Sequence, residues 1–91
     1  MTKLSVIIPV YNEEKTIKII IEKVKKVKLK GISKEIIIVD NFSEDGTRSI
    51  LKNLNDDSLK IFYHGENMGK GTSIKTGLKN STGRIILIQD A

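Results

Sequence analysis

Runs of almost unbroken aliphatic residues constrain the fold of this chain more than any other feature. They read KLSVIIPV at residues 3–10, KEIIIVD at 34–40 and RIILIQD at 84–90, and a shorter run, LKIFY, occupies 59–63. A strand with one face in water alternates apolar with polar residues, whereas a continuous apolar run is typical of a strand covered on both faces, as in parallel sheets. The pattern predicts four strands in a mostly parallel sheet.

Helical patterns separate the predicted strands. Residues 13–27 place apolar side chains at spacings of three, four and three, and weaker patterns of the same kind occupy 47–54 and 70–79. The order β-α-β-α-β-α-β implies right-handed crossovers and an open, three-layer, Rossmann-like α/β fold with helices on both faces of the sheet. In such folds, ligands bind at the carboxyl ends of the strands, above the point where strand order reverses.

Length and composition limit the class of protein. Ninety-one residues with 38% hydrophobic side chains suit one domain, which we predict to span residues 1–91. The absence of cysteine excludes disulfides and thiolate zinc sites. No apolar run approaches the roughly 20 residues of a membrane helix, and the first residues do not resemble a signal peptide. We therefore expect a cytoplasmic protein.

The net charge of +5 is concentrated in one segment. Residues 15–34 contain eight lysines and a single acidic residue, Glu22, so the local excess is greater than the charge of the whole chain. Because the lysines interleave with the apolar helix positions, we interpret them as a solvated helix face. Surfaces that bind nucleic acid usually add arginines and stacking aromatics, and this chain has only two phenylalanines and two tyrosines. We predict no nucleic-acid partner.

Candidate binding residues follow the predicted strands. Pro9 ends ladder pairing, after which Tyr11 offers a flat face and Glu13 an acceptor for a base, although the same residues also suit a strand end and a helix start. Asp40 directly follows an apolar run, where a carboxylate can accept hydrogen bonds from a ribose or a base. Lys70 stands between two glycines at a helix start, where backbone N–H groups and the ammonium favour an anion.

Four segments together resemble a known family. SVIIPVYNEE, IIIVDNFSEDGT, NMGKGTSIKTGL and GRIILIQDA follow the order and spacing of inverting family 2 glycosyltransferases with the GT-A fold, most closely the dolichol-phosphate mannose synthase-like branch. The resemblance covers the whole chain, as the N-terminal half of that fold, and implies the strand order 3-2-1-4. It implies an enzyme that transfers sugar from a nucleotide sugar, of the GDP-mannose or UDP-glucose type, to an acceptor such as a polyprenyl phosphate.

The resemblance also interprets the last three residues. In this family the fourth strand ends in a D-x-D motif whose carboxylates hold a divalent cation, and Gln89-Asp90-Ala91 is similar to that motif cut before its second aspartate. We therefore expect Asp90 to contribute to an incomplete Mg²⁺ or Mn²⁺ site. The family places its catalytic base, its acceptor pocket and any membrane-associating segment downstream. No catalytic residue is predicted within the chain, and the 91 residues alone are expected to be inactive.

The nucleotide-contacting residues that the resemblance implies come from every predicted strand end except the third. The ends of the first two strands would contact base and ribose, and the third helix and the fourth strand would contact diphosphate, ribose and metal. The predicted set is Pro9, Tyr11, Glu13, Val39, Asp40, Asn41, Lys70, Asp90 and Ala91. Many family members have a second aspartate in place of Asn41 and a glycine in place of Phe42, and these departures bear on the choice of base.

Two non-enzymatic alternatives belong to other classes. A receiver-like phosphoacceptor module also uses rim aspartates and a lysine, but it needs an aspartate at the end of its third strand, which here reads Phe62-Tyr63-His64. A basic module would instead bind nucleic acid or a membrane surface through residues 15–34. Independently of function, the apolar strand at 85–88 is a template for pairing, and we expect self-association through it.

Overall fold

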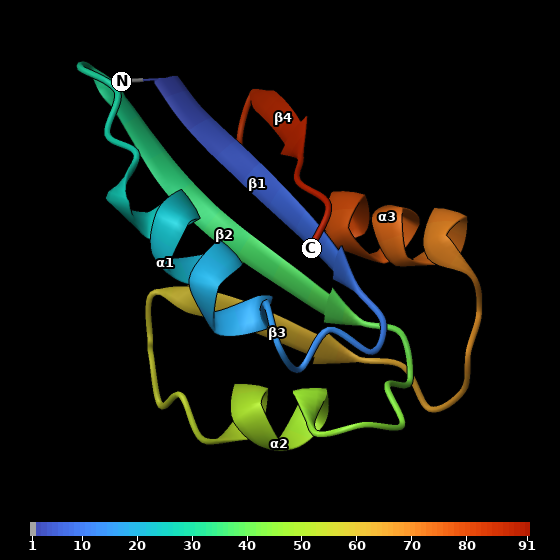
Figure 1. Cartoon of the computed structure of the whole chain (residues 1–91). Coiled ribbons are helices and arrows are strands. Elements are labelled where there is room, and N and C mark those ends of the chain that lie inside the picture. The colour runs from blue at the N-terminus through green and yellow to red at the C-terminus, as the bar shows by residue number, and fades with distance from the viewer. Residues whose placement is uncertain (1) are drawn as a thin grey trace.

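The computed structural model describes residues 2–91, which form a four-stranded parallel sheet with three helices (Figure 1). The elements in chain order are β1 (Thr2–Val10), α1 (Ile17–Lys26), β2 (Ile32–Asp40), α2 (Thr47–Lys52), β3 (Leu59–Tyr63), α3 (Lys70–Lys79) and β4 (Ile85–Ile88). The sheet order is β3-β2-β1-β4, and each pairing is parallel. The predicted alternation, layers and strand order are confirmed.

Two helices are shorter than predicted. The first begins at Ile17 rather than at residue 13, because residues 14–16 form a turn. The backbone just before this turn forms hydrogen bonds with a neighbouring loop. The second ends at Lys52, and Asn53 then donates its N–H to carbonyls of the last turn. No helix within residues 2–91 has the length and apolar character needed to cross a membrane.

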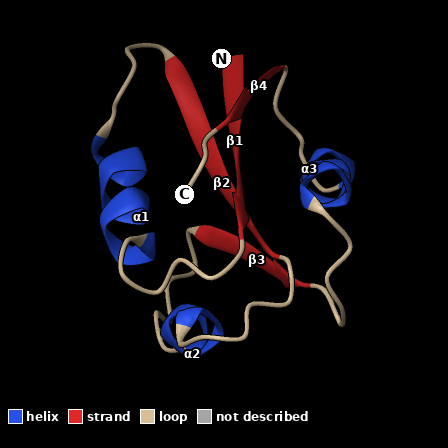
Figure 2. Ribbon diagram, turned by 45° about the vertical axis from the view of Figure 1, so that its right-hand side comes forward, coloured by secondary structure: helices blue, strands red, loops and turns tan. Residues whose placement is uncertain are grey.

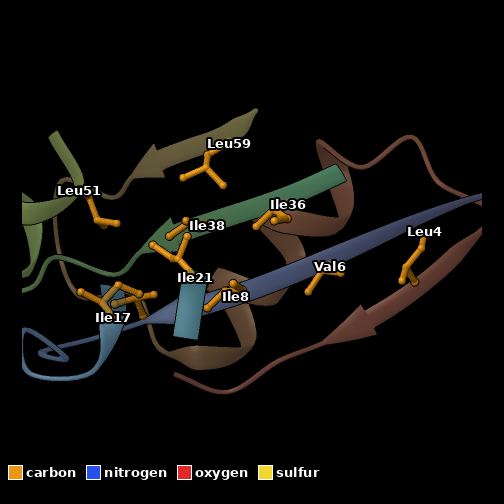
Figure 3. Packing of buried hydrophobic residues seen from close by; sticks show 10 residues of the cluster. Leu4, Val6, Ile8, Ile17, Ile21, Ile36, Ile38, Leu51 and Leu59 are labelled. Atoms are coloured by element: carbon orange, nitrogen blue, oxygen red, sulfur yellow. The ribbon is translucent and has the colours of Figure 1, made fainter. Parts of the chain in front are cut away.

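Strands β1 and β2 are covered on both faces, as their apolar runs predict, whereas the run at β4 is exposed. Helices α1 and α2 lie on one face and α3 on the other (Figure 2). Side chains of a strand alternate between faces. Ile8 and Ile38 therefore pack against Ile17 and Leu51 on the first face (Figure 3), whereas Ile7 lies beneath α3.

Helix α3 approaches the sheet closely because it carries a glycine at the contact. A Cβ atom added at Gly77 would lie 2.4 Å from Cγ2 of Ile7. This close packing fixes the position of α3 over β1 and β2, and therefore the position of the helix start that carries Lys70.

The first three strands end level with one another. Val10 pairs with Asp40, which pairs with Tyr63 on its other side. The three loops that follow these strands therefore leave the sheet along one rim. Strand β4 joins the free side of β1 and reaches the same rim through Gln89, whose N–H donates to the carbonyl of Ile7 at 2.9 Å.

Candidate functional site

A pocket of about 420 Å³ opens at this rim. Its lining comes from the ends of β1, β2 and β4 and from the segment that leads into α3: Pro9, Val10, Tyr11, Glu13, Asn41, Asn67, Gly69, Lys70, Ser73, Asp90 and Ala91. The pocket lies where the sheet order reverses between β1 and β4, which is the position at which open α/β sheets bind ligands.

The structure brings seven of the nine predicted site residues to this pocket. They are Pro9, Tyr11, Glu13, Asn41, Lys70, Asp90 and Ala91. The other two, Val39 and Asp40, are completely buried and do not line it. Their nucleotide contacts stay predictions, since neither side chain reaches the pocket in this structure.

Asp40 is occupied by protein partners. Its Oδ1 accepts a hydrogen bond from the Ser43 hydroxyl at 2.6 Å, and its Oδ2 accepts from the Ser43 N–H at 3.1 Å and from Arg48 Nε at 2.6 Å. Arg48 also donates to the carbonyl of His64 and lies over the ring of Tyr63, 5.4 Å from its centroid. This carboxylate therefore holds α2 and the loop after β3 to the end of β2.

The loops after β1 and β2 are joined by a second set of bonds. The backbone N–H groups at the start of the first loop donate to side chains of the second: Asn12 to Ser43, Glu13 to Thr47, and Glu14 to Asp45. In return, the side chains of Asn12 and Glu14 accept from backbone N–H groups at Glu44 and Gly46. Because both loops are held in this way, Tyr11 and Glu13 are positioned before any ligand arrives.

Asn41 connects the pocket to the loop before α3. Its Oδ1 accepts the N–H of Met68 at 2.8 Å and lies 3.1 Å from Nδ1 of His64, and its Nδ2 donates to Oδ1 of Asn67 at 2.9 Å. Because Oδ1 can only accept, Nδ1 of His64 is the protonated nitrogen in this arrangement. The ring is held on its other side by the Thr76 hydroxyl, 2.9 Å from Nε2.

The cationic side of the pocket is an exposed ion pair. Nζ of Lys70 bonds to Oδ1 of Asp90, and the two side chains are 60% and 71% exposed. Lys70 is the first residue of α3, where the helix dipole and free N–H groups also favour an anion. Lys70 is thus available to an anionic ligand, and Asp90 is available to a cation.

The predicted metal site can be judged by the ligand atoms that the described residues supply. A carboxylate oxygen is the ligand type that Mg²⁺ and Mn²⁺ prefer, which Asp90 supplies. Within residues 2–91, however, no group of three or more His, Cys, Asp or Glu side chains could hold a metal. The described residues therefore provide one protein ligand and fit such a cation only in part.

Sequence reasoning missed Val10, Asn67, Gly69 and Ser73 as lining residues. Ser73 follows Lys70 at the helical spacing of three, so it lies on the same side of α3 and could have been inferred from Lys70. Asn67 carries no such signal, because its place beside Asn41 depends on the path of the loop after β3. Gly69 has a φ of +86°, which a glycine adopts without strain.

Phe42 allows a prediction about backbone strain. Its φ is +63°, and the Arg48 guanidinium lies 5.3 Å from its ring centroid. Phe42→Ala should destabilise the fold by about 1 kcal/mol, because a cation–π contact of about 0.5–1 kcal/mol is lost while the strain stays. Phe42→Gly should be about 1 kcal/mol more stable than Phe42→Ala, because glycine tolerates a positive φ. Urea unfolding measures both, and equal stabilities would contradict a strained backbone here.

The fold and the pocket define a Rossmann-like α/β domain with a ligand site at its topological reversal. Glycosyl transferase family 2 matches residues 5–91, and this chain belongs to that family. This membership argues against the receiver-like and purely basic-module alternatives.

Similar proteins include glycosyltransferase AglE of Haloferax volcanii, 35% identical over 89 residues, covering 96% of this chain and 29% of that protein. Dolichyl-phosphate beta-glucosyltransferase ALG5A of Trichomonas vaginalis is 33% identical, covering 97% and 30%. The chain therefore spans less than a third of the length of these relatives.

Solved structures agree in fold. TarS 1-349 of S. aureus superposes with a TM-score of 0.82 at 33% identity, covering 97% of this chain and 27% of that one. The mannosyltransferase PcManGT of Pyrobaculum calidifontis, solved with GDP-Man and Mn²⁺, gives 0.78 at 27% identity, covering 98% and 27%.

Proposed function

We propose that residues 1–91 form the nucleotide-sugar-binding domain of a glycosyltransferase. The observation that carries this proposal is the pocket at the β1–β4 reversal, which gathers an aromatic ring, an amide, an ammonium and a carboxylate from four separate segments. A nucleoside diphosphate requires this combination: a flat surface and polar groups for the base, a cation for the phosphates, and an acceptor for ribose or metal.

The residues divide between the two ends of such a ligand. Tyr11, Glu13 and Asn41 lie at the ends of β1 and β2 and would hold the base and ribose. Lys70 would contact the diphosphate at the start of α3. The ion pair between Asp90 and Lys70 would then open, and Asp90 would bind a divalent cation or a ribose hydroxyl instead. A bound Mg²⁺ or Mn²⁺ would neutralise charge on the leaving nucleoside diphosphate.

Asn41 rather than Asp40 is the better candidate for the base contact after β2. Both strand neighbours were predicted as contacts, but Asp40 is buried against Arg48, whereas Asn41 lines the pocket. The Asn41 oxygen accepts from Met68 and lies beside Nδ1 of His64, and one N–H of the amide donates to Asn67, so the second N–H of the amide is the group left for a ligand. An N–H donor suits a carbonyl of uracil or guanine.

The relatives support a proposal for the donor, the acceptor and a membrane location. Similar structures carry GDP-Man and Mn²⁺ or UDP-GlcNAc, and a similar protein acts on dolichyl phosphate. We therefore propose a GDP- or UDP-sugar donor and a lipid-phosphate acceptor, for a protein that works in the cytoplasm at a membrane. The catalytic base is not among the residues that we assign.

Titration with GDP and UDP, with and without Mn²⁺, tests the binding proposal. Backbone NMR shifts should centre on Tyr11, Asn41 and Lys70, and Lys70→Ala should weaken binding at least fivefold, because the diphosphate loses its cation. Lys79→Ala, at the other end of α3, is the matched control and should bind as the unaltered chain does. Shifts spread evenly over the surface would contradict the proposal.

Self-association through β4 is a separate proposal. All four residues of this strand are exposed, and within residues 2–91 β4 pairs only with β1, so this part of the chain presents a free, apolar edge. We expect dimers or larger species by light scattering. Ile86→Lys should suppress them by placing a charge on the edge, whereas Leu78→Lys, the same change at an exposed position of α3, should not. A monomeric chain at high concentration would contradict this proposal.

A further inference from the structure

His64 does not line the pocket but contacts it through Asn41. It directly follows β3, on the segment that joins this strand to α3 (Figure 1), and its side chain is partly buried. Its backbone is held on both sides, because its N–H donates to the carbonyl of Asp40 at 2.9 Å and its carbonyl accepts from Arg48. The imidazole ring is therefore kept in one place beside Asn41.

Both nitrogens of the His64 ring have partners. Nδ1 lies 3.1 Å from Oδ1 of Asn41, and Nε2 lies 2.9 Å from the hydroxyl of Thr76 in α3. This hydroxyl also lies 3.1 Å from the carbonyl of Thr72. It can donate to Nε2 when the ring is neutral, or donate to Thr72 and accept from Nε2 when the ring is charged. Nδ1 keeps its proton in both states, because the oxygen that it faces can only accept.

The orientation of the Asn41 amide follows from backbone groups that can only donate. The N–H of Met68 donates to Oδ1 of Asn41 at 2.8 Å, and the N–H of Gly69 donates to Oδ1 of Asn67 at 3.0 Å. That Asn67 oxygen then accepts from Nδ2 of Asn41 at 2.9 Å. A reversed Asn41 amide would set its NH₂ group against the N–H groups of Met68 and His64, and its oxygen against the oxygen of Asn67.

We propose that His64 is a positioning residue that makes the pocket selective for bases carrying a carbonyl group. This inference rests on the proposed function, since it concerns the base of the nucleotide. Nδ1–H of His64 holds the oxygen of Asn41 and so keeps the second N–H of the amide turned toward the ligand. Uracil at O4 and guanine at O6 offer an acceptor to that N–H, whereas cytosine and adenine carry an amino group in the same place.

The selection comes from rejection of the wrong base as well as from attraction of the right one. An amino group opposite the Asn41 N–H places two donors together and leaves both without an acceptor. Asn41 is only 5% exposed, so water can replace the missing acceptor only in part. The preference is therefore lost when the amide is free to turn over, and His64 is the side chain that donates to its oxygen.

Titration of the chain with UDP, CDP, GDP and ADP tests the proposal. UDP should bind about tenfold more tightly than CDP, and GDP about tenfold more tightly than ADP, since an unpaired buried donor costs at least this much. The ratio within each pair is the useful quantity, because a general loss of structure weakens the binding of all four nucleotides alike.

Two substitutions of His64 separate the N–H group from the ring. His64→Phe keeps a ring of similar size without a donor and should lower both ratios about fivefold, the equivalent of one ordinary hydrogen bond. His64→Asn places an amide N–H where Nδ1 stands and should restore both ratios to within about twofold of the unaltered chain. Circular dichroism shows whether each variant is folded.

Nitrogen-15 NMR of the histidine ring gives a second readout that does not depend on nucleotide affinity. The chain contains one histidine, so the spectrum reports His64 alone. In the free chain the neutral ring should carry its proton on Nδ1, and Asn41→Ala should remove this preference, because the acceptor oxygen is lost. A neutral ring protonated on Nε2 in the unaltered chain would refute the proposed contact.

Three results of the titrations would also overturn the proposal. Equal affinities within each pair, or tighter binding of CDP and ADP, would refute the selection and leave nucleotide binding standing. Unchanged ratios in His64→Phe would show that His64 does not set the amide, and an equal loss in His64→Asn would show that the ring matters rather than its N–H. A chain that binds none of the four nucleotides would contradict the proposed function, and this inference with it.

Discussion

Glu35→Ala is expected to lower the free energy of unfolding by about 3 kcal/mol, because it removes a buried carboxylate that accepts several hydrogen bonds. Glu35 is buried at the amino-terminal part of β2 and accepts from Lys60 Nζ at 2.7 Å, from the Ser5 hydroxyl at 2.5 Å and from the Thr82 N–H at 2.6 Å. These donors come from β3, from β1 and from the segment before β4. One carboxylate therefore joins three strands of the described sheet and the segment that leads into the fourth.

The stability that Glu35 provides should depend on pH. Burial alone would raise the pKa of this carboxyl, but hydrogen bonds from Lys60, Ser5 and Thr82 outweigh burial and hold the pKa well below its usual range. A group with a depressed folded-state pKa stabilises the fold above its unfolded-state value of 4.5, and this contribution is lost as the pH falls below that value.

Urea unfolding at pH 7 and pH 3 measures both effects. Glu35→Gln should be less stable than the unaltered chain at pH 7 and should lose less stability on acidification. Glu66→Gln is the matched control, since Glu66 is exposed. A Glu35→Gln variant as stable as the unaltered chain at pH 7 would show that the charge is not needed.

Asp40→Ala is expected to have an effect of similar size, about 3–5 kcal/mol, and to impair nucleotide binding only indirectly. The substitution leaves Arg48 without its buried carboxylate and frees Ser43, which otherwise holds the N–H of Asn12. The loops after β1 and β2 then lose an interaction that holds them together. Asp40 is thereby a positioning residue in this structure, not a pocket-lining one.

A comparison with Asn41→Ala separates the two roles. Asn41→Ala should weaken GDP or UDP binding while costing less stability than Asp40→Ala, because its partners Asn67 and Met68 lie at the partly exposed loop. Urea unfolding of both variants measures the loss of stability, and titration with GDP or UDP measures the loss of binding. If Asp40→Ala kept full stability and lost binding, a direct contact with the nucleotide would be established in place of positioning.

The sequence alone was sufficient for the fold. The apolar runs at β1, β2 and β4 have no polar alternation, which is typical of strands covered on both faces, and the helical spacing between them predicts the helices that supply the cover. The resemblance added the strand order, which is confirmed. Even so, all four residues of β4 are exposed in this chain. Whether this strand is covered depends on the elements that pack beside it, and not on its own apolar sequence.

The tertiary structure decided which of two adjacent strand-end residues faces the site. Side chains alternate along β2, so Asp40 shares the face of Ile36 and Ile38, where α2 brings Arg48 to meet it. Asn41 continues on the other face, where the loop before α3 and Lys70 complete the pocket. The alternation can be read from the sequence. The face that holds the pocket cannot, because it depends on where distant loops and α3 pack against the sheet.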